Sequence, residues 1–77
     1  MLDQNIIEKV VDKILKLEKD QEFQIKKLLR PYNIEDETLL FRYSMAILNK
    51  MKGKVRISKR YVNAVIDVPY MAIFRRG

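Results

Sequence analysis

Residues 35–57 read EDETLLFRYSMAILNKMKGKVRI, and the hydrophobic period changes inside this stretch. Up to Met51 the apolar residues recur at helical spacing, as on one face of an α-helix. In the residues that follow, cations alternate with other side chains, which would place the cations together on one face of a strand. The stretch therefore predicts a helix from about Glu35 to Met51, a left-handed residue at Gly53 and a short strand over 54–57.

Two further helices are predicted before this stretch. The first runs from about Asp3, whose carboxylate can cap the free N–H groups of a helix start, to Lys19. The second runs from about Gln21 to Leu29 and must end there, because Pro31 disfavours the helical conformation of the residue before it. The pattern leaves open whether these two segments form one continuous rod, although polar residues at the junction favour a bend.

After the strand, Ser58 is a suitable N-cap for another helix that ends near Asp67. The short apolar run over residues 70–75 fits either a strand or a last helical turn. The chain contains only 2 Gly and 2 Pro, which favours short connections between helices. We therefore expect one mainly α domain over residues 1–77, with three to four helices. A two-stranded β element formed by 54–57 and 70–75 remains an option.

The sequence contains neither Cys nor His. Disulfides are therefore excluded, and the residues that supply most zinc sites and most acid–base catalysis are missing. A cap at Asn33 followed by carboxylates over 35–37 is what the positive end of a helix favours, so these acids predict a helix start and not a metal site. The hydroxyls of Thr38, Ser44 and Ser58 have no histidine or glycine-rich elbow beside them. We expect no enzyme activity, no cofactor and no metal.

Charged residues interrupt every long apolar stretch. The longest uncharged runs have seven residues, one of them at 68–74, whereas a membrane-spanning helix needs about 20. Charged residues also interrupt the apolar residues of the N-terminal segment 1–17. We therefore expect no signal peptide, no membrane partner and a cytoplasmic location.

The charge is divided unevenly along the chain. The net charge is +6 over 77 residues, but residues 1–38 carry seven cations and nine carboxylates, whereas residues 39–77 carry nine cations and Asp67 as their single carboxylate. A solvated surface usually mixes both signs, as the first part of the chain does. The basic half, residues 31–77, is therefore the expected contact surface, and the mixed-charge helices of 1–30 are expected to form the core or a dimer contact.

The basic half predicts a phosphate-binding surface. Lys and Arg side chains that neutralise a nucleic-acid backbone release counterions, so a compact cationic patch gains affinity without reading the bases. We expect a small DNA-binding or DNA-associated regulatory protein. The alternative is an adaptor or inhibitor, of the kind found in phages and plasmids, that docks on an acidic protein surface; a plain solvated surface is the third interpretation. The predicted nucleic-acid contacts are Lys50, Lys52, Lys54, Arg56, Lys59, Arg60 and Asn63.

Residues 37–67 resemble a helix-turn-helix or winged-helix unit. The positions that carry the resemblance are a small residue, a turn glycine, a turn hydrophobe, a cap and two buried positions, namely Ala46, Gly53, Ile57, Ser58, Val62 and Ile66. The resemblance implies that Lys59, Arg60 and Asn63 face the major groove, with Asn63 able to contact adenine. In the simpler interpretation, Ser58 only caps a helix and the two apolar residues only fill the core.

The N-terminal apolar stripe has two interpretations. Ile7, Val10, Ile14 and Leu17 lie at helical spacing and belong either to the core of the chain or to a homodimer interface. The intramolecular core is the first interpretation, and a homodimer interface on these residues is the second, because small domains often supplement a limited core by association.

Overall fold

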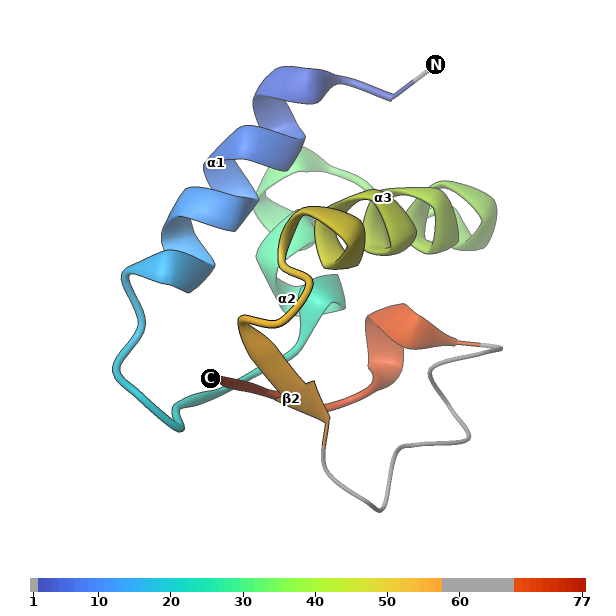
Figure 1. Ribbon diagram of the computed structural model, residues 1–77. Coiled ribbons are helices and arrows are strands. Elements are labelled where there is room, and N and C mark those ends of the chain that lie inside the picture. Colours follow the sequence, from blue (N-terminus) through green and yellow to red (C-terminus); the bar gives the residue numbers. More distant parts are fainter. Residues whose placement is uncertain (1, 58–67) are drawn as a thin grey trace.

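The computed structural model describes residues 2–57 and 68–77, and predictions that fall on residues 58–67 lie outside it. In the described part of the chain, helices α1, α2 and α3 pack against a small antiparallel sheet that lies at one end of the molecule (Figure 1). The prediction of a small, mainly helical domain is confirmed.

Helix α1 spans Gln4–Leu15 and begins as predicted. Asp3 is its N-cap, and the carboxylate of Asp3 accepts a hydrogen bond of 2.9 Å from the backbone N–H of Asn5. The helix ends at Leu15 and not at Lys19, because the chain turns away to form a strand.

The predicted helix over 21–29 is wrong in its first part. Glu22–Phe23 forms strand β1, and only Ile25–Leu29 forms helix α2. A two-residue strand carries almost no period of its own, so its pairing with a distant strand decides its conformation. A short 3-10 helix, η1 at Arg30–Tyr32, then follows Leu29 as the proline requires.

Helix α3 spans Glu37–Lys50, close to the predicted range. Its N-cap is Asp36 and not Asn33, since the Asp36 carboxylate accepts a hydrogen bond of 3.0 Å from the backbone N–H of Leu39. Asn33 instead adopts a left-handed conformation with φ 60°, which lets the chain reverse between α2 and α3. Gly53 also adopts a left-handed conformation, with φ 80°, as predicted.

The sheet has three strands in the described residues, not the two that were expected. Strand β2 is Val55–Ile57, and strand β3 is Phe74–Arg76 after a 3-10 helix, η3, at Pro69–Met71. The β element over 54–57 and 70–75 is thus confirmed in part, since residues 69–71 of the tail are helical. Strand β3 lies in the middle, and the order is β1-β3-β2.

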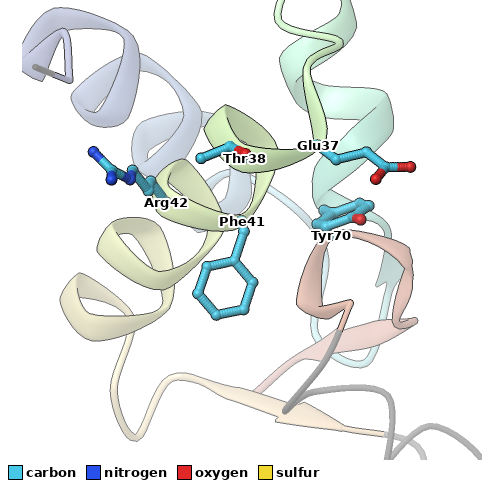
Figure 2. A pocket seen from close by; sticks show the side chains of 5 residues that line it. All are labelled: Glu37, Thr38, Phe41, Arg42 and Tyr70. Carbon is cyan, nitrogen blue, oxygen red and sulfur yellow. The ribbon is translucent and has the colours of Figure 1, made fainter.

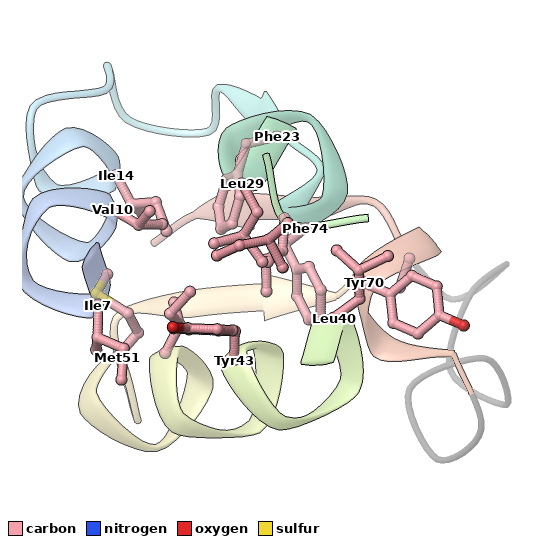
Figure 3. Packing of buried hydrophobic residues seen from close by; sticks show 14 residues of the cluster. Ile7, Val10, Ile14, Phe23, Leu29, Leu40, Tyr43, Met51, Tyr70 and Phe74 are labelled. Carbon is pink, nitrogen blue, oxygen red and sulfur yellow. The ribbon is translucent and has the colours of Figure 1, made fainter. Parts of the chain in front are cut away.

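The core lies where the helices meet the sheet, and side chains of α1, α2 and α3 converge on the same space as Phe74 (Figure 3). Ile7, Val10 and Ile14 are at most 1% exposed, so their side chains have no free surface to offer to a second copy. These three residues therefore belong to the intramolecular core, which is one of the two interpretations of the stripe, and a homodimer contact in this region stays a prediction. Leu17 is half-buried and packs against the same core.

We expect Ile14→Ala to lower the free energy of unfolding by about 2–5 kcal/mol, because it leaves a cavity in a fully buried site. Urea unfolding followed by circular dichroism measures the loss, with the exposed neighbour Lys13→Ala as the control. The loss should not vary with protein concentration. A loss that disappears at high concentration would show that Ile14 acts in a dimer contact instead.

Candidate nucleic-acid interface

The predicted basic segment runs from the end of α3 into the sheet. Lys50 is the last residue of α3, Lys52 and Lys54 lie in the turn that follows, and Arg56 is the middle residue of β2. These four cations are exposed, but they do not share one strand face as the alternation predicted, because only Arg56 belongs to a strand. We refer to Lys50, Lys52 and Lys54 as the lysine turn.

The lysine turn is anchored on the fold. Between the first two lysines, the side chain of Met51 is 0% exposed and lies in the core. The backbone N–H of Lys54 donates to the carbonyl of Met51 at 2.8 Å, and the carbonyl of Lys54 accepts from the N–H of Gly77 at 2.8 Å. Three cations are thus carried by a backbone that is held to the core at one end and to the sheet at the other.

Two cations of the sheet are neutralised by carboxylates from the first part of the chain. Arg56 forms an ion pair with Asp20, and Arg75 forms one with Glu22 at 3.4 Å. The Arg75–Glu22 pair follows from the strand register, because Arg75 faces Glu22 on β1. On its other side Arg75 faces Arg56 on β2. Although Arg56 is exposed, its charge is therefore compensated, whereas the third arginine of the sheet, Arg76 of β3, takes part in neither ion pair.

The lysine turn keeps its charge uncompensated within the described residues. Neither ion pair that forms among residues 2–57 and 68–77 includes one of its lysines. No carboxylate occurs anywhere between residues 38 and 57. Three cations without a paired carboxylate are therefore grouped at the C-terminal end of α3.

The outward face of α3 continues this surface. The side of the helix that faces the core carries Leu40, Tyr43, Ser44 and Ile47. The opposite side carries four exposed residues at spacings of four, three and four, and we call them the α3 row: Thr38, Arg42, Met45 and Asn49. The row is absent from the predicted contacts, because those come from the dense run of cations that begins at Lys50. The sequence could have predicted the row, because the apolar stripe of a helix also defines which positions lie on its exposed side.

An apolar flank borders the row near the start of α3. A hollow of about 330 Å³ is lined by Thr38, Phe41, Arg42 and Tyr70 together with Glu37, and Phe41 and Arg42 leave the helix in different directions (Figure 2). Phe41 is 37% exposed, and Met45 and Met71 are each 41% exposed. Exposed large apolar side chains of this kind are typical of contact surfaces when they are grouped.

The predicted helix-turn-helix unit over 37–67 needs correction. Helix α3 is followed by strand β2, so Ile57 lies in a strand and not in the turn between two helices. Both helices that contact α3 in the described chain, α1 and α2, precede it. The predicted contacts Lys59, Arg60 and Asn63 lie outside the described residues.

Other kinds of site find no support in the described residues. Within 2–57 and 68–77, no three acidic side chains gather closely enough to hold a metal ion. In the same ranges no helix has the length and apolar character needed to cross a bilayer. Comparison with protein-family models, curated proteins and solved structures finds no match to this chain.

We expect the Arg75–Glu22 pair to contribute less than about 1 kcal/mol to stability, because both side chains are at least half exposed. A double-mutant cycle with Arg75→Gln and Glu22→Gln measures the coupling by urea unfolding. The coupling should shrink in about 1 M salt, where charges are screened within about 3 Å. A coupling that persists unchanged at high salt would contradict an electrostatic origin.

Proposed function

We propose that this protein binds duplex DNA, with helix α3 in the major groove and the lysine turn on the phosphate backbone. The observation that carries the proposal is that residues 38–57 contain no carboxylate and present both the exposed α3 row, with its hydrogen-bonding side chains, and the three lysines of the lysine turn, none of which is ion-paired in the described chain. Phosphate contacts supply affinity and position, and base-edge contacts supply selectivity.

The order of elements supports the proposal by analogy. Helices α2 and α3 followed by the strands β2 and β3, with β1 on the other side of β3, resemble a winged-helix arrangement. In helix-turn-helix proteins the second helix enters the major groove and the first crosses the backbone. By this analogy α3, and not the segment after β2, is the recognition helix.

The dimensions of α3 suit a groove. Its 14 residues correspond to a rod of about 21 Å at 1.5 Å per residue. With side chains a helix is about 10–12 Å wide, and the major groove is about 12 Å wide, so the exposed half of α3 can enter it.

The charges on α3 also define an orientation. The helix begins beside Glu35, Asp36 and Glu37 and ends in the lysine turn. Phosphates repel the acidic end and attract the basic end, so the C-terminal end of α3 should lie closest to the backbone.

A second candidate function rests on the apolar flank. Phe41, Met45 and Met71 are exposed beside Arg42, and apolar side chains next to a cation also suit an acidic protein partner. This is the adaptor or inhibitor function that the sequence predicts as the alternative. It predicts no affinity for nucleic acid, and the following titration separates the two functions.

We expect affinity for a labelled duplex to fall log-linearly with salt, because each phosphate contact contributes about 0.9 to the slope. Replacing Lys50, Lys52 and Lys54 by Gln should lower the slope by up to about 3. The matched control replaces Lys9, Lys13 and Lys16 of the α1 region by Gln, which changes the net charge equally. Fluorescence anisotropy measures binding, and circular dichroism checks the fold.

The control triple variant should keep most of the slope. An equal loss in both triple variants would mean that binding depends on net charge and not on the lysine turn. Absence of measurable binding to any duplex at about 50 mM salt would exclude DNA as the ligand and leave the adaptor function.

We also expect a gain of affinity when the sheet carboxylates are neutralised. Asp20→Asn with Glu22→Gln frees Arg56 and Arg75 for phosphates and should steepen the salt slope by up to about 2. Asn tolerates the left-handed conformation of residue 20, whose φ is 66°. The matched control is Glu8→Gln with Asp12→Asn on α1. If both double variants tighten binding equally, the sheet arginines have no local role.

A further inference from the structure

The α3 row contains two side chains that suit base recognition. Arg42 and Asn49 are separated by seven residues and project from the same exposed side of α3. In the described part of the chain, neither side chain takes part in a hydrogen bond or an ion pair with another residue. Their donors and acceptors are therefore available to a ligand.

The chemistry of these two residues points to two different bases. An arginine guanidinium donates two parallel hydrogen bonds to O6 and N7 of guanine, whereas an asparagine amide pairs with N6 and N7 of adenine. Each such pair is planar and bidentate, so it rejects the other bases through unpaired polar groups.

The spacing of the two residues relates them to DNA geometry. Seven residues of α-helix rise about 10.5 Å, and one base pair rises about 3.4 Å, so the two side chains reach positions about three base pairs apart. Met45 lies between them on the same row and is 41% exposed. An apolar side chain in the major groove favours the methyl group of thymine.

We infer that α3 selects a DNA sequence with a guanine and an adenine about three base pairs apart and a thymine between them. Arg42 reads the guanine, Asn49 reads the adenine and Met45 contacts the thymine methyl group. The inference rests on the proposed function, because it names the ligand of the same helix face.

The test is selection of bound duplexes from a randomised pool by the full chain, followed by sequencing. The enriched element should contain the guanine and the adenine at this spacing. Arg42→Lys keeps the charge but loses the bidentate fork, so it should relax the preference at guanine alone. Asn49→Ala should relax the preference at adenine alone.

Affinity for the selected element should fall about ten- to a hundredfold in each variant, whereas affinity for random duplex should stay nearly constant. Lys13→Ala on α1 is the control and should leave the selected element unchanged. Circular dichroism checks each fold, and Asn49→Ser replaces Asn49→Ala if that variant unfolds.

The outcomes distinguish a failure of the inferred sequence preference from a failure of the proposed DNA-binding function. Salt-sensitive binding without any preferred sequence overturns the inference and leaves the proposed function standing. An enriched element that neither variant relaxes also overturns the inference. Absence of binding to every duplex at about 50 mM salt overturns the proposed function itself.

Discussion

The fold depends on the insertion of β3 between β1 and β2. Strand β3 closes the sheet by pairing with β1 in the first third of the chain and with β2 in the last third. Phe74 of β3 packs on Phe23 of β1 with ring centroids 5.7 Å apart. The backbone of Arg76 also accepts from the N–H of Asp20 at 2.7 Å and donates to the carbonyl of Gln21 at 3.0 Å. Strands of two or three residues are not stable alone, so the sheet and the helices that cover it must form together.

This dependence explains which parts of the fold the sequence could predict. The helices α1 and α3 each bury one stripe of their own residues, and that stripe is visible as a local period. Strand β1 has no such local signal, because Glu22 and Phe23 become a strand only by pairing with Arg75 and Phe74, about fifty residues later. Local pattern therefore predicts helices well and predicts short paired strands poorly.

The same long-range pairing explains the errors at the candidate site. In the sequence, Arg56 lies in a run of cations that contains no carboxylate. In the fold, however, Asp20 forms an ion pair with Arg56. The lysine turn lies between α3 and β2, and none of its lysines takes part in an ion pair among the described residues. The α3 row could have been predicted, since the buried positions of a helix define its exposed positions. Local periods did not indicate which helices and strands lie side by side, because that depends on contacts between distant residues.

The ion pairs of the sheet also bear on the proposed contact with DNA. If Asp20 and Glu22 did not neutralise the arginines, phosphates would be attracted to the sheet and to the end of α3 alike. Two attractive regions would permit several orientations of similar energy, and nonspecific binding would gain more than specific binding. With Arg56 and Arg75 paired, the lysine turn stays free of ion pairs in the described chain, and the carboxylates at the start of α3 repel phosphate at the other end. In the proposed binding mode the acidic residues of the first part of the chain therefore favour one orientation over others, while the basic residues of the second part supply the affinity.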